Sequence, residues 1–284
     1  MPDVWTVQRT LNWCCGYLEN HADEHPRLSA EWLLSAATGL SRVELYAYYD
    51  RPLSEDERAV LRESLKRRGK GEPLQYVTGE AAFRHIVVKT APGVLIPRPE
   101  TETLVQLVLD HFAGREGFDA LEVGTGTGCI ACSLAKEADA RVVATDVSDA
   151  AIACARRNVE AYGLAEFVEL VYTDCVADVE GSFDALISNP PYIPTAVMDE
   201  LDFEVTGFEP HLALDGGPDG LDFFDRLLAE ALPLVRAGGF FACELHETCL
   251  DEAAQRLAET DVADVTITQD LTGRPRFVSG IVVR

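Results

Sequence analysis

The chain has 284 residues, of which 47% are hydrophobic and 25% charged, and its formal net charge at pH 7 is −24. This length suits one large domain plus a small one. No apolar run approaches the roughly 20 residues of a membrane-spanning helix, so we expect no membrane association. The start, Met1-Pro2-Asp3-Val4-Trp5, lacks the basic and apolar segments of a signal peptide, which predicts a cytoplasmic protein.

The charge is divided unevenly along the chain. Residues 1–93 carry 12 basic and 13 acidic side chains, a net of −1, whereas residues 94–284 carry 12 basic and 35 acidic ones, a net of −23. A field of this sign repels phosphate backbones. We therefore expect no direct nucleic-acid binding by residues 94–284, and we expect the protein to be a monomer.

The N-terminal pattern is helical from Val4 to about Lys70 and predicts a small helical bundle over residues 1–71. Ser41 and Ser54 are expected N-caps, and Ser54 has Glu57 three residues later, as in a capping box. The last helix ends in a basic cluster: Arg58, Arg62, Lys66, Arg67, Arg68 and Lys70. Cations are favourable near a helix C-terminus, and a contact surface for an acidic or RNA-bound partner is the alternative.

Residues 72–93 are expected to be a linker that carries a β-hairpin. Gly71-Glu72-Pro73 ends the helical pattern, and the stretch from Phe83 to Lys89 is typical of a strand. Ile96-Pro97-Arg98-Pro99 then introduces an amphipathic helix from Glu100 to Phe112.

A regular alternation of strands and helices follows and predicts one domain over residues 94–284. The expected strands are 120–123, 141–145, 168–172, 183–188, 239–244, 265–269 and 277–283, and the expected helices are 129–137, 149–162, 223–235 and 248–258. Strands joined by crossover helices form parallel sheets. The sequence therefore predicts an α/β fold with a doubly wound, seven-stranded, mostly parallel sheet.

Glycines follow the first of these strands at every second position, Gly124, Gly126 and Gly128. Glycine lets the backbone bend sharply and leaves room for a ligand. The spacing differs from the dinucleotide pattern G-x-G-x-x-G, which disfavours a pyrophosphate cradle. At the ends of the next two strands, Asp146 can accept from both hydroxyls of a ribose and Asp174 from an adenine amino group. Together these residues predict a pocket for an adenosine without phosphates.

The motif Asn189-Pro190-Pro191-Tyr192 follows a buried strand, at the edge where open α/β sheets bind ligands. The prolines end the strand because neither offers an N–H group. An asparagine followed by bare carbonyls and an aromatic ring can hold a planar amide or amino group.

The cysteines include a single C-x-x-C pair, Cys129 and Cys132, without a second pair at zinc spacing. We expect these two as small apolar residues on one helix face, and no metal site.

These motifs resemble those of the release factor glutamine N5-methyltransferases, a family of class I S-adenosylmethionine-dependent methyltransferases. The resemblance covers nearly the whole length and rests on Gly71-Glu72-Pro73-Leu74-Gln75-Tyr76 with Gly79, on Leu95-Ile96-Pro97-Arg98-Pro99-Glu100-Thr101-Glu102, on the segments Glu122 to Gly128 and Asn189 to Tyr192, and on Phe208-Glu209-Pro210 and Asp219-Gly220-Leu221. Asn-Pro-Pro-Tyr also occurs in DNA adenine and RNA guanine methyltransferases, so the segment before the glycine loop is the more specific signal.

The resemblance implies methyl transfer from S-adenosyl-L-methionine to the side-chain amide N5 of a glutamine in peptide-chain release factors. This is the glutamine of the GGQ motif, and its methylation modulates translation termination. Residues 1–71 would dock the protein substrate. The cofactor would be bound by Gly124, Thr125, Gly126, Thr127, Gly128, Asp146, Asp174, Cys175 and Asn189. The glutamine would be held by Asn189, Pro190, Pro191 and Tyr192, of which Asn189, Pro190 and Tyr192 are the expected catalytic residues.

The sequence departs from the family pattern after Asp174. The family often has an aromatic residue there that covers the adenine, whereas this chain has Cys175, so stacking is weaker or another side chain takes the role. Arg98 is expected either in a loop ion pair with Glu100 or at the mouth of the substrate site. Glu122 is expected to orient the glycine loop by accepting backbone N–H groups.

Direct transfer requires no nucleophilic residue, and none is evident. The Asn189 side-chain oxygen and the Pro190 carbonyl can each accept one N–H of the target amide, which fixes its plane. Tyr192 would supply a flat wall, and its backbone N–H would donate to the glutamine carbonyl. The released proton would pass to water.

Three other functions remain open from the sequence. A glutamine methyltransferase acting on a ribosomal protein would share every catalytic residue. A nucleic-acid amino methyltransferase is disfavoured by the net charge of −23 over residues 94–284. A non-catalytic adaptor is disfavoured by the intact motif from Asn189 to Tyr192.

Overall fold

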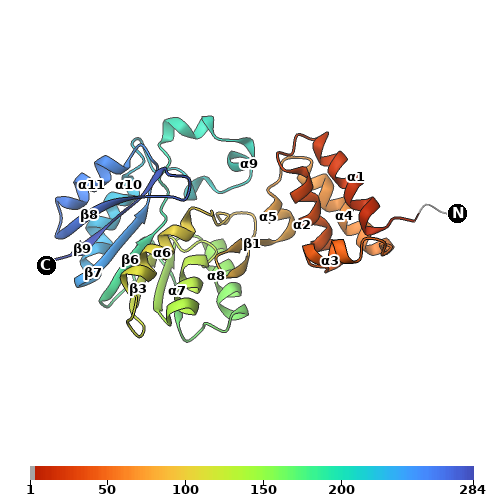
Figure 1. The fold of residues 1–284 in the computed structure, drawn as a ribbon. Coiled ribbons are helices and arrows are strands. Elements are labelled where there is room, and N and C mark those ends of the chain that lie inside the picture. Colours follow the sequence, from red (N-terminus) through yellow and green to blue (C-terminus); the bar gives the residue numbers. More distant parts are fainter. Residues whose placement is uncertain (1–3) are drawn as a thin grey trace. The chain divides into compact units, whose positions relative to one another are not determined.

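The structure is a computed structural model that describes residues 4–284. It contains two compact units (Figure 1). The first runs as far as Glu80 and also includes Asp202–Phe208, and the second comprises Ala81–Leu201 and Glu209–Arg284. In the described part of the chain, no helix combines the length and apolar character needed to cross a bilayer.

The first unit is a bundle of short helices around a core of buried leucines. Its helices are α1 (Val7–Glu19), α2 (Pro26–Thr38), α3 (Arg42–Ala47), α4 (Glu55–Arg68) and α5 (Leu74–Thr78). Both expected caps are confirmed, because Ser41 and Ser54 each form a complete capping box, with Glu44 and Glu57. The unit extends beyond residue 71 because α5 packs against α2 and α4.

Two arginines at the end of α4 hold the first unit together. Arg67 pairs with Glu72, and Arg68 pairs with Asp23 and with Glu204 of α9 (Phe203–Thr206). The side chain of Arg68 is only 11% exposed. The C-terminal cations of α4 therefore include internal ties, and α9 belongs to this unit through one of them.

A β-hairpin lies within residues 72–93, as expected, but this stretch is divided between the two units and is not a separate linker. The hairpin consists of β1 (Glu80–Phe83) and β2 (Ile86–Lys89). Phe83 and Val88 are fully buried in the core of the second unit. The Asn158 side chain accepts from the Lys89 N–H and donates to the Lys89 carbonyl, which fastens β2 to the neighbouring helix.

The second unit is built on a seven-stranded sheet. Its strands are β3 (Asp119–Val123), β4 (Arg141–Asp146), β5 (Val168–Tyr172), β6 (Phe183–Ser188), β7 (Val235–Glu244), β8 (Val262–Gln269) and β9 (Pro275–Val282). Their order is β5-β4-β3-β6-β7-β9-β8. The strands β3 to β7 are parallel, while β9 runs antiparallel to both β7 and β8. The predicted mostly parallel sheet is confirmed.

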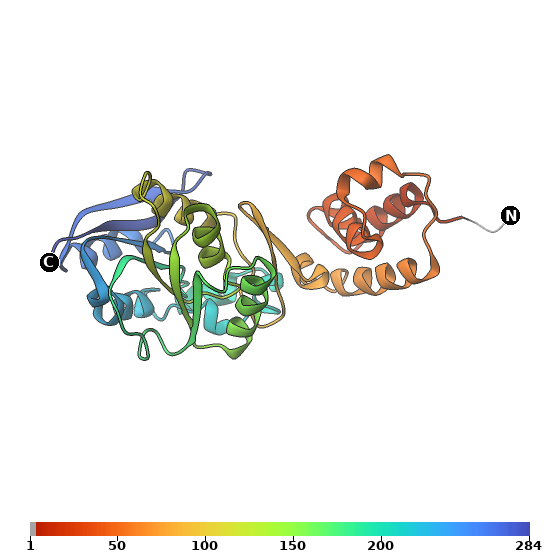
Figure 2. The same cartoon turned by 90° about the horizontal axis from the view of Figure 1, so that it is seen from below.

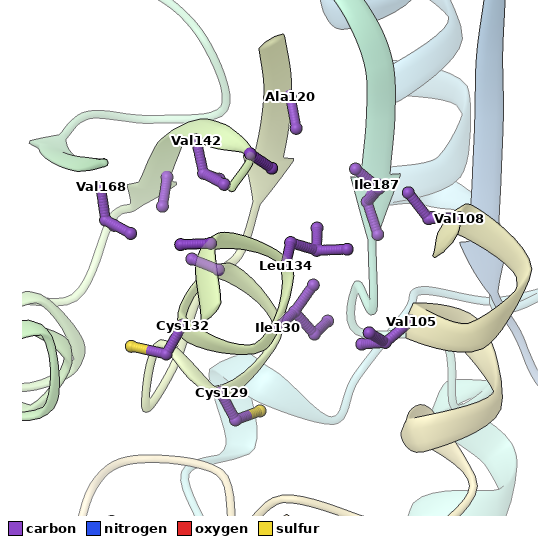
Figure 3. Packing of buried hydrophobic residues seen from close by; sticks show 14 of the residues in the cluster. Val105, Val108, Ala120, Cys129, Ile130, Cys132, Leu134, Val142, Val168 and Ile187 are labelled. Atoms are coloured by element: carbon purple, nitrogen blue, oxygen red, sulfur yellow. The ribbon is translucent and has the colours of Figure 1, made fainter. Parts of the chain in front are cut away.

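Helices cover both faces of this sheet, as Figure 1 and, from below, Figure 2 show. One face packs against α6 (Thr101–His111), α7 (Cys129–Ala138) and α8 (Asp149–Ala161), and the other against α10 (Asp222–Arg226) and α11 (Leu250–Ala258). Figure 3 shows Ile130 and Leu134 of α7 between the strands and α6. Cys129 and Cys132 are buried in the same hydrophobic cluster, and they act there as small apolar residues, as expected.

The predicted helix over 223–235 differs from the structure. Only α10 is α-helical, and it continues as a π turn, Leu227–Ala231, and a 3₁₀ turn, Leu232–Leu234. Pro233 interrupts the helix because it offers no N–H. Val235 already belongs to β7, where it pairs with Phe183.

Candidate active site

The site lies where the ends of β3 and β6 meet. Val123 and Ser188 are register partners, and the Ser188 hydroxyl donates to the Val123 carbonyl at 2.7 Å. The next residues, Gly124 and Asn189, therefore lie side by side. From this point the chain proceeds from β3 toward β5 on one side and from β6 toward β7 on the other, and such a switch point opens a crevice for ligands.

A cavity opens at these strand ends, within the second unit. Its lining includes the predicted cofactor residues Gly124, Thr125, Gly126, Thr127, Asp146, Asp174, Cys175 and Asn189, and the predicted substrate residues Arg98 and Pro191. Gly128, Pro190 and Tyr192 are not part of the lining. The structure thus brings most of the predicted cofactor residues to one cavity, together with Asn189, Pro191 and Arg98, whereas the predicted catalytic residues Pro190 and Tyr192 lie outside its lining.

The glycine loop has the conformation that its sequence predicts. Gly124, Gly126 and Gly128 have φ angles of 79°, 56° and 78°, which side-chain-bearing residues rarely adopt. A Cβ atom at Gly126 would meet nothing within 4 Å, so the loop backbone faces open space there. At Gly128 a Cβ atom would lie 3.1 Å from the Cβ of Ala155 in α8. Gly126 leaves room for a ligand, and Gly128 allows close helix packing.

Glu122, in β3, stabilises this loop through hydrogen bonds. It is fully buried, and its Oε2 accepts from the Thr125 hydroxyl at 2.9 Å and from the Ala131 N–H at 3.1 Å. Burial raises the pKa of Glu122 to about 8, and the nearby Asp146 charge adds to this effect. The expected orienting role of Glu122 agrees with these contacts.

Asp146 is held by the backbone on both carboxylate oxygens. Its Oδ2 accepts from the Gly126 N–H and its Oδ1 from the Ser148 N–H, each at 2.9 Å. Burial raises the pKa of Asp146, and these hydrogen bonds oppose the shift. Each oxygen retains acceptor capacity, so the carboxylate is fixed and still able to accept from a pair of hydroxyls.

At the predicted adenine end of the pocket, Asp174 and Cys175 make contacts within the protein that the sequence did not predict. Asp174 is ion-paired with Arg226 at 2.8 Å, with its side chain 60% exposed. Cys175 is buried, and its carbonyl accepts from the Thr145 hydroxyl. An aromatic ring does line the cavity, but it is Phe223 of α10, with the Arg226 guanidinium 5.4 Å from the ring centroid.

Asn189 is oriented by a buried chain of hydrogen bonds. Its Nδ2 donates to Thr101 Oγ1 at 3.0 Å, and that hydroxyl donates to Glu244 Oε2 at 2.7 Å. The Tyr192 hydroxyl donates to Glu244 Oε1 at 3.1 Å. The Asn189 Oδ1 atom is buried and has no hydrogen-bond partner among the described residues. Asn189 lines the cavity, and its oxygen is the acceptor that the bond to Thr101 leaves free.

Two glycines pack against the backbone of Tyr192. A Cβ atom at Gly220, where φ is +79°, would lie 2.5 Å from the Tyr192 carbonyl oxygen, and one at Gly216 would lie 2.7 Å from the Tyr192 Cα. Ile193 donates to the Leu214 carbonyl and accepts from the Gly216 N–H. The segment 214–220 therefore sets the path of the chain after Asn189.

Arg98 pairs with Glu209 and not with Glu100. The distance is 2.5 Å, and the side chain of Glu209 is 1% exposed. The other Glu209 oxygen accepts from the Ile96 N–H at 3.2 Å. Through these two bonds, Glu209 holds the segment from Ile96 to Glu102 at the edge of the cavity.

Comparison with known proteins agrees with this geometry. Residues 9–79 match the family described as PrmC N-terminal domain, and residues 85–201 match the methyltransferase small domain. The release factor glutamine methyltransferase of Geobacter sulfurreducens is 40% identical over 284 residues, which cover 98% of each chain. The chain belongs to the release factor glutamine methyltransferase family. The relative from Moorella thermoacetica is 45% identical over 242 residues, 84% of this chain and 85% of that one.

A solved methyltransferase from Pyrococcus furiosus is similar in structure to this chain. The match has a TM-score of 0.53 and 26% identity and covers 69% of this chain and 89% of that chain. The predicted Rossmann-like methyltransferase fold is thus confirmed. The chain is a methyltransferase, and its methyl donor is S-adenosyl-L-methionine.

The cavity of this family member fits that donor. The open backbone at Gly126 leaves space for a ligand, and Asp146 presents fixed acceptors of the kind that suit a pair of hydroxyls. The ring of Phe223 offers an apolar face.

Sequence reasoning gave no role to three residues of the site: Thr101, Phe223 and Glu244. Thr101 belongs to the quoted segment before the glycine loop, but nothing in the sequence shows that it contacts Asn189, 88 residues away. Glu244 ends a strand, as Asp146 does, and this position was the available signal.

Proposed function

We propose that this chain methylates the side-chain amide nitrogen of a glutamine in peptide-chain release factors, the glutamine of the GGQ motif. One observation carries the proposal: the buried, unpartnered Oδ1 of Asn189, whose amide is oriented by Thr101, beside the glycine loop. A buried acceptor without a partner is costly. An amide N–H of the substrate would satisfy it.

The donor would lie against the glycine loop. Asp146 would accept from the ribose hydroxyls, and Phe223 would cover the adenine in place of an aromatic at the position of Cys175. When bound, S-adenosyl-L-methionine supplies a methyl group activated by a sulfonium. The residues of this chain supply orientation, which can contribute roughly 7–11 kcal/mol to a two-reactant step.

The target amide would be held by two acceptors. Asn189 Oδ1 would accept one N–H and the Pro190 carbonyl the other, so that the amide plane is fixed. Both acceptors favour the positive charge that grows on the nitrogen during transfer. Tyr192 would donate its backbone N–H to the glutamine carbonyl, and Glu244 keeps its ring in place. Glu244 is enclosed, so the proton lost after transfer passes to water.

A labelling assay tests the proposal. The protein is incubated with radiolabelled S-adenosyl-L-methionine and, separately, with release factor, ribosomal protein, DNA and RNA. We expect label on the release factor alone, and none after its GGQ glutamine is changed to glutamate, which has no N–H to donate. Label on the ribosomal protein or a nucleic acid, without label on the release factor, would contradict the proposal.

For the helical unit we propose docking of the release factor. Support comes from a hollow lined by Trp5, Trp13, Arg58 and Arg62, in which Trp13 is 51% exposed. Tryptophan and arginine are enriched at the energetic centres of protein interfaces. The double variant Arg58→Glu/Arg62→Glu should raise KM for the release factor and leave kcat unchanged.

The matched control is Lys66→Glu on the same helix, where the lysine pairs with Glu63 outside the hollow. It should change KM little. Equal effects of the two variants per reversed charge would indicate general electrostatics and no docking site.

A further inference from the structure

A series of buried, hydrogen-bonded side chains leads to Asn189, the residue proposed to hold the substrate. Ser188 and Cys243 are register partners in β6 and β7, so the next residues, Asn189 and Glu244, lie next to each other. Thr101, the first residue of α6, lies between their side chains and bonds to both. Thr101 and Glu244 are 2% and 1% exposed, so water does not compete for these bonds.

The direction of these bonds follows from the number of protons. A carboxylate has no proton and can only accept. The single hydroxyl proton of Thr101 goes to Glu244, so Thr101 can offer Asn189 only a lone pair. Asn189 must then present its NH₂ group to Thr101, which leaves its oxygen on the side away from Thr101.

From this geometry we infer that Glu244 and Thr101 are positioning residues that determine which end of the Asn189 amide faces the substrate. The inference rests on the proposed function and deepens it. The two orientations of an asparagine amide have nearly the same shape, so hydrogen bonds decide between them. The reversed amide would direct an NH₂ group at the N–H groups of the target and repel it.

The hydrogen-bond relay from Glu244 through Thr101 to Asn189 requires that Glu244 is ionised. The groups that face it are Thr101 and Glu100 from the start of α6, Tyr192 from the loop after β6, and Arg276 from β9. Burial raises the pKa of Glu244 to about 7, against the hydrogen bonds of Thr101 and Tyr192 and the Arg276 charge, while the Glu100 charge adds to the rise. A protonated Glu244 has a hydrogen to donate, which allows Thr101 to turn its own proton toward Asn189. Activity should therefore rise with pH through neutrality.

The first test compares Thr101→Val with Thr101→Ser. Valine has the shape of threonine but neither donates nor accepts, and serine restores the hydroxyl. We expect Thr101→Val to lower kcat about 10- to 100-fold, as expected for a lost hydrogen bond and a misplaced reacting group. Thr101→Ser should stay within a few-fold of the wild type. Affinity for S-adenosylhomocysteine, measured by calorimetry, should change little in either variant. The Tm should fall in Thr101→Val, which leaves buried groups of Asn189 and Glu244 unpaired, and should stay near the wild-type value in Thr101→Ser.

The second test is the pH profile of kcat. Glu244→Gln offers one acceptor where two hydroxyls donate, and it does not titrate. We expect the limb near pH 7 in the wild type to be absent from this variant. The matched control is His246→Asn, a neighbouring titratable residue whose ring hydrogen-bonds to Thr248, and it should keep the limb.

These outcomes separate the inference from the proposed function. Missing label on the release factor with the wild type contradicts the function, and the relay is then tested on whichever substrate is labelled. Hydrogen exchange of the Asn189 NH₂ group, followed by NMR, tests it without any substrate, with faster exchange expected in Thr101→Val. Unchanged kcat and unchanged exchange in Thr101→Val, or a limb that persists in Glu244→Gln, would overturn the relay.

Discussion

Two of the buried glutamates of the second unit lie in the strands on either side of β6, and they bond to different kinds of partner. Glu122, in β3, uses one carboxylate oxygen to accept from the Thr125 hydroxyl and the Ala131 backbone. Glu244, at the end of β7, uses both oxygens to accept from the hydroxyls of Thr101 and Tyr192. Burial raises the pKa of both, to about 8 and about 7.

The difference separates the shape of a site from its polarity. Glu122 holds a loop that glycine conformations and strand pairing also define, so its charge adds little to the geometry. Glu244 holds side chains whose direction no other bond determines. Burying a carboxylate is costly. Glu122 stabilises the backbone of a loop in return, whereas Glu244 fixes the orientation of reactive groups. The following variants test this contrast, in order of expected effect on activity.

Asn189→Ala removes the acceptor to which the Glu244 network leads. We expect kcat to fall about 100- to 1,000-fold, the usual range for one oriented polar group at a reacting centre. The Tm should change little, because the Asn189 side chain bonds only to Thr101 in the described structure. Near-normal turnover would show that Asn189 has no role in the mechanism. The proposed orienting role of Glu244 and Thr101 would then fail as well.

Gly220→Ala tests whether the path of the backbone after Asn189 matters as much as its side chain. The added Cβ would lie 2.5 Å from the Tyr192 carbonyl oxygen, so the chain must shift, and a shift of about 1 Å can cost about 100-fold in rate. The control is Gly238→Ala, which has a similar φ of +77° but no atom within 4 Å. It should lower stability and leave kcat unchanged.

Phe223→Ala tests the cofactor side of the comparison. Loss of a stacked ring typically costs about 1–3 kcal/mol per base, so affinity for S-adenosylhomocysteine should fall about 5- to 150-fold. Phe223→Tyr keeps the ring and should bind normally in the same calorimetric titration. Equal affinities for Phe223→Ala and the wild type would show that another group covers the adenine.

Glu122→Gln should have the smallest effect on activity and a clear effect on stability. Burial raises its folded pKa from an ordinary 4.5 to about 8, so the unfolded chain loses the proton first. The wild type should therefore lose folding free energy between these pH values. The variant lacks this loss, so its stability relative to the wild type should grow from pH 5 to pH 8. Urea unfolding at both pH values checks this, and a constant difference would contradict it.

Local chemistry explains which parts of the structure the sequence predicts. The caps at Ser41 and Ser54, the turns at Gly124 to Gly128 and the strand end at Asn189 depend on residues a few positions apart. The sequence predicts too late a start for β7, because Val235 joins the sheet through Phe183, 52 residues earlier in the chain.

The missed site residues share the same reason. Thr101 reaches Asn189 and Glu244 only after α6 is placed against the sheet, and Arg98 finds Glu209 from 111 residues away. Such contacts depend on strand order and register, which the spacing of residues along the chain does not contain.

The unpartnered oxygen of Asn189 also bears on how many times the enzyme acts on one glutamine. A primary amide brings two N–H groups to the Asn189 and Pro190 acceptors, whereas the methylated product has one left. The product therefore leaves one acceptor unsatisfied and binds less well than the substrate. The same two atoms that recognise the amide would favour release after a single transfer, and mass spectrometry of the release factor should show one added methyl group and never two.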